Sequence, residues 1–206
     1  MTPHAPSPED SARRLLAMAR ERPSVYLIGI AGIPGSGKST LCEAVRMIAP
    51  SVAVVPMDGY HIPRRFLDVE GLRRRGAPHT FDVEAFRRDI ESLRVAREGS
   101  FPAFDHAEGD PRTAAIDVTR STPLVLIEGL YVLLRAWRIS SLLDISVFLD
   151  CDTDKAMDRV AHRHLATGLA DTLDMARSRA ITNDRVNAMA ILADGCRERA
   201  DLVLPS

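Results

Sequence analysis

Lysine is the residue that this sequence most conspicuously lacks. Of its 27 basic side chains only Lys38 and Lys155 are lysines, so arginine is the default cation. The 28 acidic residues balance these cations to a formal net charge of −1. A balanced charge gives no indication of a polyanionic partner, and we therefore expect no binding to nucleic acid.

Cysteines and long apolar runs are also few. Cys42, Cys151 and Cys196 are widely spaced and form no C-x-x-C pair, which is typical of a reduced protein of the cytoplasm. Residues 1–14 contain no apolar stretch that could act as a secretory signal. The longest apolar run, at 123–134, is interrupted by a glutamate and is too short to cross a bilayer. We therefore expect a cytoplasmic protein that does not associate with a membrane.

One of the two lysines lies in a phosphate-binding pattern. Residues 32–39, GIPGSGKS, match G-x-x-x-x-G-K-[ST], the phosphate-binding loop (P-loop) of nucleoside triphosphate enzymes. A compact ammonium can enter a cradle of backbone amides, whereas a planar guanidinium is broader. An apolar, strand-like run at 25–30 precedes the loop, and apolar residues at helical spacing follow it. The residues expected to bind the nucleotide phosphates are Gly32, Gly35, Ser36, Gly37, Lys38, Ser39 and Thr40, and Lys38 is also expected to be catalytic.

The alternation of apolar segments indicates the fold class. A chain of 206 residues suggests one domain. Its expected strands are apolar throughout and alternate with helices, which is typical of a parallel sheet covered on both faces. We therefore expect an α/β fold, a three-layer P-loop nucleoside triphosphatase with a roughly five-stranded sheet and helices on both faces. The expected strands are 25–31, 52–57, 124–127, 144–149 and 201–204, and the expected helices are 10–22, 37–49, 82–97, 153–167 and 173–193.

The remaining segments set the expected domain organisation. Residues 1–9 are rich in proline and are expected to form a flexible N-terminus to a single P-loop domain over 10–206. Segment 59–80 carries five arginines and is expected to be a loop. Segment 100–122 is too long for a plain connection and is expected to be irregular. Long loops of this kind are usually functional or disordered, so both are expected to cover a ligand.

Two acidic residues directly follow expected strands. Asp58 follows 52–57 and Glu128 follows 124–127, and ligands bind beyond the carboxyl ends of parallel strands. We expect Ser39 and Glu128 to hold Mg²⁺ with ATP, and Asp58 to accept the proton of an attacking hydroxyl. Two alternatives stay open. Glu128 could be a helix cap or a paired structural charge, and Asp58 could form a plain Asx turn.

Two arginines lie four residues apart on the expected helix 153–167. Arg159 and Arg163 share a face and could reach over the triphosphate as a lid, with Arg159 in a catalytic role and Arg163 binding the nucleotide. The alternative is a solvated cationic face in which these arginines pair with Asp154 or Asp158.

An ordered set of segments beyond the P-loop resembles the phosphoribulokinase, uridine kinase and type I pantothenate kinase family of P-loop kinases. The segments are MDGYH at 57–61, GAPHTFD at 76–82, PAFDH at 102–106, LIEGLYVL at 126–133, 150–163 and NDRVNA at 183–188. The resemblance covers residues 25–204. It is nearest to a small bacterial subgroup described as nucleoside kinase-like or fructose transport system kinases. Uridine kinases have more aromatic residues for stacking than the six Phe, three Tyr and one Trp here, and the other members are larger.

The resemblance implies an ATP-dependent kinase that phosphorylates a hydroxyl of a sugar, a nucleoside or a related metabolite. It implies Mg²⁺ as a cofactor, and adenine is expected near 183–204. A homodimer is compatible with the sequence. The residues expected to bind the acceptor are Asp58, His61, His79, Asp82, Asp105 and His106. Asp82 could alternatively only cap the helix that it precedes.

Two other functions compete with a kinase. A GTPase switch needs an N/T-K-x-D element, and the only lysine outside the P-loop, Lys155, does not lie in one, so ATP is expected over GTP. A nucleotide-binding regulator without metabolite kinase activity stays open as the alternative function.

Overall fold

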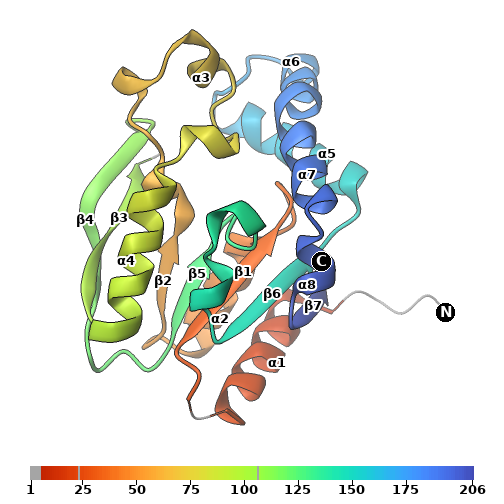
Figure 1. The fold of residues 1–206 in the computed structure, drawn as a ribbon. Helices are drawn as coiled ribbons and strands as arrows, with labels where there is room; N and C mark the ends of the chain where they lie inside the picture. The colour runs from red at the N-terminus through yellow and green to blue at the C-terminus, as the bar shows by residue number, and fades with distance from the viewer. Residues whose placement is uncertain (1–5, 23, 106) are drawn as a thin grey trace, which may run out of the picture.

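The computed structural model describes residues 6–22, 24–105 and 107–206. Its centre is a parallel five-stranded sheet in the order β2-β5-β1-β6-β7 (Figure 1). The strands are β1 Leu27–Gly32, β2 Ala53–Pro56, β5 Val125–Glu128, β6 Ile145–Asp150 and β7 Leu202–Pro205. This confirms the expected α/β fold and its parallel five-stranded sheet.

Helices cover both faces of the sheet because successive strand residues point to opposite faces. Ile28 and Ile30 of β1 pack with α1 (Pro8–Arg20) and α2 (Lys38–Ile48). Leu27 and Ala31 belong to the opposite core, which includes α4 (Val83–Ala96). The remaining helices are α3 Val69–Arg73, α5 Thr153–Ala166, α6 Leu173–Arg179, α7 Arg185–Ala193 and α8 Cys196–Arg199.

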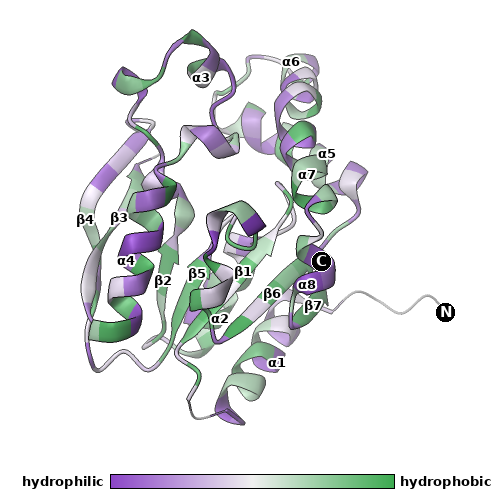
Figure 2. Cartoon of the chain, in the orientation of Figure 1, coloured by the Kyte–Doolittle hydropathy of each residue, from purple (hydrophilic) through white to green (hydrophobic). Residues whose placement is uncertain are grey.

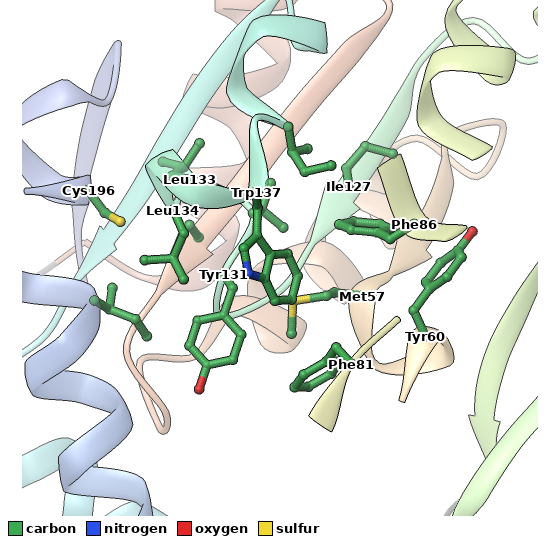
Figure 3. Packing of buried hydrophobic residues seen from close by; sticks show 14 of the residues in the cluster. Met57, Tyr60, Phe81, Phe86, Ile127, Tyr131, Leu133, Leu134, Trp137 and Cys196 are labelled. Atoms are coloured by element: carbon green, nitrogen blue, oxygen red, sulfur yellow. The ribbon is translucent and has the colours of Figure 1, made fainter. Parts of the chain in front are cut away.

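The core on the α4 side of the sheet contains most of the large aromatic residues. Trp137 lies among Tyr131, Phe81 and Phe86, with ring centroids 5.3, 5.8 and 6.2 Å away (Figure 3). Figure 2 shows hydrophobic residues along the central strands and several hydrophilic turns on α4. No helix in the described residues is long and apolar enough to cross a membrane.

The expectation that segment 100–122 is irregular is wrong. The segment forms an antiparallel hairpin of β3 (Gly99–Asp105) and β4 (Asp110–Val118), with a register shift between Phe101 and Ala103. Only one residue on each strand, Phe101 and Val118, is buried. The two-residue alternation that marks a strand is therefore weak in the sequence.

Three other boundaries differ from expectation. The first helix begins at Pro8, so the expected flexible tail at 1–9 is helical at its end; residues 1–5 lie outside the described part. Segment 59–80 contains the short helix α3 and single turns at 64–66 and 78–80. The expected helix 173–193 is divided by a π-turn at Ala180–Asp184.

Candidate active site

The P-loop joins β1 to α2 and is packed tightly on two sides. Gly35 and Gly37 have φ of +78° and +85°, a region that favours glycine. A Cβ on Gly35 would lie 2.2 Å from the carbonyl oxygen of Ala156, and one on Gly32 would lie 2.8 Å from that of Leu149. These glycines therefore allow the loop to lie against α5 and β6.

Lys38 is folded back into this loop. Its side chain is buried, and its ammonium donates a hydrogen bond to the carbonyl oxygen of Ile33 at 3.0 Å. Burial lowers the pKa of Lys38, whereas the nearby carboxylates of Glu128 and Asp58 raise it. The hydroxyl of Ser36 is buried and has no hydrogen-bond partner among the described residues. The loop thus holds a cation and an unsatisfied donor, as a phosphate site requires.

The strand register brings the two expected acidic residues to this edge of the sheet. Glu128 ends β5 and is level with Ile30 on one side and Pro56 on the other. Burial raises the pKa of Glu128 to about 7; the charges of Lys38 and Asp58 act in opposite directions on it.

Asp58 lies two residues beyond Pro56, in the turn Met57–Tyr60. It is exposed, and no hydrogen bond of its carboxylate occurs within the described residues, so the Asx turn is not observed. A Cβ on Gly59 would lie 2.3 Å from the carbonyl oxygen of Pro102. The glycine therefore lets the turn that carries Asp58 pack against the β3–β4 hairpin.

Two cavities meet at Ser39. The large cavity has a volume of about 910 Å³ and is lined by the P-loop, the start of α2, Arg159 and Arg163. The small cavity, of about 230 Å³, is lined by Asp58, Glu128 and Phe104 among others. Ser39 lines both. Of the residues expected to be catalytic, Lys38 and Arg159 line the large cavity and Asp58 lines the small one.

The lid arginines do not form the paired surface face that was the alternative. Asp154 pairs with Arg185 and Asp158 with His162. Arg159 instead donates hydrogen bonds to the carbonyl oxygen of Gly35 at 3.3 Å and to the hydroxyl of Ser206 at 3.1 Å.

The expected acceptor residues are less closely gathered. His61 stacks on Phe81, with centroids 4.0 Å apart, and lies 5.1 Å from Phe104. Burial lowers the pKa of His61. Asp82 is exposed and caps α4 by accepting a hydrogen bond from the amide of Ala85 at 2.9 Å. The alternative cap role of Asp82 is therefore present, and its acceptor role stays a prediction.

The other expected acceptor residues lie at turns. His79 is exposed in the turn 78–80, and Asp105 accepts hydrogen bonds from the amides of Ala107 and Glu108 at the hairpin end. Neither lines the two cavities. His106 lies outside the described residues.

Sequence reasoning missed the residues that hold segment 59–80 in place. Arg75 pairs with Asp110 of the hairpin at 2.7 Å, with its guanidinium 5.6 Å from the ring of Phe104. The carbonyl oxygen of Gly76 accepts hydrogen bonds from the hydroxyl of Tyr131 at 2.7 Å and from the side-chain amide of Asn187 at 3.2 Å. The only signals in the sequence were the arginine-rich loop and the NDRVNA segment. Neither indicates which residues it contacts.

The nucleotide base was expected near 183–204. The large cavity is lined by Pro205 and Ser206, directly after that range, and by residues 6–8, 10 and 11 at the start of α1. Of these, residues 6–8 belong to the expected flexible N-terminus, and residues 10 and 11 belong to the expected helix 10–22. The position of the base stays a prediction.

Comparisons with known proteins agree with this geometry. A model described as "Phosphoribulokinase / Uridine kinase family" matches residues 27–205. "Putative uridine kinase C227.14" of Schizosaccharomyces pombe is 40% identical over 177 residues, which cover 78% of this chain and 75% of that protein. "ATP-dependent kinase YFH7" of Lachancea thermotolerans is 32% identical, over 87% of this chain and 65% of its own length.

A solved structure is similar over its whole length. It is described as a "putative fructose transport system kinase from Silicibacter sp. TM1040", and superposes with a TM-score of 0.82 at 34% identity, covering 98% of this chain and 100% of that chain.

Proposed function

Because this chain belongs to the phosphoribulokinase / uridine kinase family, we propose that it transfers the γ-phosphoryl group of ATP to a hydroxyl group of a small metabolite. The observation that carries the proposal is the position of Ser39. This P-loop residue lines the large cavity together with Lys38, and it lines the small cavity together with Asp58. A phosphoryl group bound there would have the nucleotide on one side and an acceptor on the other.

The residues at this boundary suit Mg²⁺. Ser39 and Glu128 both line the small cavity and offer oxygen atoms, which are the ligands that Mg²⁺ takes. Within the described residues no group of three or more His, Cys, Asp or Glu side chains could hold a metal ion. This fits Mg²⁺, which keeps several waters and takes phosphate oxygens as further ligands. When bound, the ion would neutralise charge that develops on the phosphate oxygens.

The remaining residues have separate roles in the transfer. Lys38 and the P-loop amides stabilise the phosphates, and Arg159 and Arg163 close over them from α5. Asp58 accepts the proton of the attacking hydroxyl. Its carboxylate is free of hydrogen bonds within the described residues and is therefore available for this task.

The acceptor that fits best is a small polyhydroxylated metabolite. The small cavity, about 230 Å³, is a quarter of the size of the large one. The ring of His61 is stacked on Phe81 and lies at a tilt to Phe104. These rings already contact one another, which favours an acceptor without a base that needs stacking.

The direct test is ADP release from ATP and Mg²⁺, with and without sugars, hydroxy acids, nucleosides and pantothenate, using the purified chain. We expect release that depends on one acceptor class, with a phosphorylated product detectable by mass spectrometry. Binding of ATP without release for any acceptor would favour the regulator without metabolite kinase activity. Comparable efficiency with GTP would contradict the expected preference for ATP.

A further inference from the structure

The large cavity extends beyond the space that phosphates need. It has a volume of about 910 Å³, at the upper end of the roughly 300–1,000 Å³ typical of ligand sites. One end is the P-loop, where the triphosphate binds. The lining also includes Pro6, Ser7, Pro8, Asp10 and Ser11 at the start of α1, and Pro205 and Ser206 at the end of β7. α1 begins beside β7 (Figure 1).

The first turn of α1 is a built structure rather than a tail. Ser7 and Asp10 form a reciprocal capping box, in which the amide of Asp10 donates to the Ser7 hydroxyl at 3.1 Å. The amide of Ser7 in turn donates to the Asp10 carboxylate at 3.3 Å. Such a box fixes the direction in which the chain enters the helix.

Buried side chains anchor this turn to the rest of the domain. Ser11, Leu15 and Leu16 are at most 7% exposed, and Leu15 and Leu16 pack in the same core as Leu41 of α2. Because α2 begins at the P-loop, packing of α1 on α2 sets the position of the capped turn relative to the phosphates.

The C-terminal part of the cavity is fixed independently. The amide of Ser206 donates to the carbonyl oxygen of Asp150 at 2.8 Å, and Arg159 links the Ser206 hydroxyl to the P-loop carbonyl of Gly35. Prolines from both ends of the chain therefore line one cavity whose other end is the P-loop. Their rings offer apolar surface to a flat ligand, with polar groups of Ser7 and Asp10 beside them.

We propose that the first turn of α1, Pro6–Ser11, forms one wall of the site for the nucleotide's purine base, together with Pro205 and Ser206. The inference rests on the proposed function, because it takes the nucleotide phosphates to bind at the P-loop. It gives the N-terminal helix a role in nucleotide affinity, in addition to its packing role.

The test distinguishes binding of the base from binding of the phosphates. Ser7→Trp places a large ring in the cavity, while Ser7→Ala removes the cap without adding bulk. Arg14→Trp adds the same ring on an exposed position of α1. The dissociation constants of a non-hydrolysable ATP analogue and of inorganic tripolyphosphate are measured for each purified full-length variant, together with its melting temperature.

We expect Ser7→Trp to weaken binding of the ATP analogue by about tenfold or more and to leave tripolyphosphate binding unchanged. Arg14→Trp should bind both ligands like the wild type. Ser7→Ala, which loses the cap but adds no ring, should lose less affinity for the ATP analogue than Ser7→Trp does. Unchanged affinity of Ser7→Trp for the ATP analogue would overturn the inference while leaving the proposed function intact. An equal loss for both ligands would also overturn it, because the damage would then lie at the P-loop. Wild-type protein that binds neither ligand would overturn the proposed function itself, and the inference with it.

Hydrogen exchange of the wild-type protein gives a readout that does not depend on any variant. The backbone amides of Ser7, Glu9, Asp10 and Ser11 should be protected by the ATP analogue and not by tripolyphosphate. Equal exchange with both ligands would show that the base does not contact this turn, and would overturn the inference.

Discussion

The ammonium of Lys38 donates a hydrogen bond to the carbonyl oxygen of Ile33, five residues earlier in the same loop, at 3.0 Å. The P-loop is therefore closed on its own lysine, and the ammonium is already inside the cradle that a phosphate would enter. Burial lowers the pKa of this lysine, and the carboxylates of Glu128 and Asp58 oppose that effect. A charge held in such a place interacts strongly with a bound anion.

Lys38→Ala should remove most phosphoryl transfer and leave the fold intact. The ammonium contacts phosphates and stabilises charge that develops in the transition state, so we expect a loss of about 3 kcal/mol or more in transition-state stabilisation. The measurement is kcat/KM for ATP, with circular dichroism to check the fold. Lys155→Ala, at the exposed second lysine, is the matched control and should behave like the wild type. Near wild-type transfer by Lys38→Ala would show that the loop is not the catalytic cradle.

Asp58→Asn should lower kcat far more than it weakens ATP binding. The amide keeps the shape of the side chain but cannot accept the hydroxyl proton, and loss of such a group typically costs about 10²- to 10⁴-fold in rate. Turnover and the dissociation constant for ATP are measured on the same preparation. If the two change by the same factor, Asp58 is a metal-binding or structural residue instead.

The sequence predicts the positions of the P-loop, Asp58 and Glu128 well because each signal there is local. The P-loop pattern, the apolar strands and the acids directly after them are all contiguous in the chain. Once the sheet is parallel, Glu128 and Asp58 must come to the same edge as Ser39. The register of β5 between β1 and β2 confirms that step.

The segments 59–80 and 100–122 are held by contacts between residues far apart in the chain, which no local pattern encodes. Arg75 and Asp110 are 35 residues apart, and Gly76 and Asn187 are 111 apart. The hairpin that brings Asp110 into place has few buried residues, so it resembled an irregular loop. The lining of the large cavity by α1 likewise arises from packing of α1 on α2, and not from any motif in residues 6–11.

Two substitutions of Asp82 distinguish its observed role as a helix cap from its predicted role in binding the acceptor. Its carboxylate caps α4, and asparagine caps helices about as well as aspartate. Asp82→Ala should lower stability by about 1 kcal/mol, and Asp82→Asn should restore it. If Asp82 also binds the acceptor, both variants should raise the acceptor KM with ATP affinity unchanged. A lower melting temperature for Asp82→Ala alone, with acceptor kinetics unchanged in both, would remove Asp82 from the site.

The buried pair of His164 and Asp184 gives a prediction for the pH dependence of stability. Nε2 of His164 lies 3.6 Å from Oδ2 of Asp184, and their side chains are 6% and 14% exposed. Burial, followed by the charges of Arg179 and Arg163, lowers the pKa of His164 to about 4 from 6.5. Burial raises the pKa of Asp184 to about 6 from 3.8, against the opposing charges of the same arginines.

These two shifts act in opposite directions on the free energy of unfolding. As pH falls from 6.5 to about 4, the unfolded chain protonates His164 and the folded chain does not, so stability is lost. Over nearly the same range, from about 6 to 3.8, the folded chain protonates Asp184 and the unfolded chain does not, so stability is gained. The contributions of the pair therefore largely cancel in the wild type.

Asp184→Asn should expose the contribution of His164, because asparagine has nearly the shape of the protonated aspartate and no titration. Relative to the wild type, the free energy of unfolding of the variant should fall by about 2 kcal/mol between pH 6.5 and pH 4. Urea unfolding at several pH values measures this difference. Asp158→Asn is the control, since Asp158 and its partner His162 are about 60% exposed and an exposed pair contributes little. A pH profile for Asp184→Asn that runs parallel to the wild type would show that Asp184 titrates normally in the folded protein, and that its contact with His164 has no effect on stability in this range.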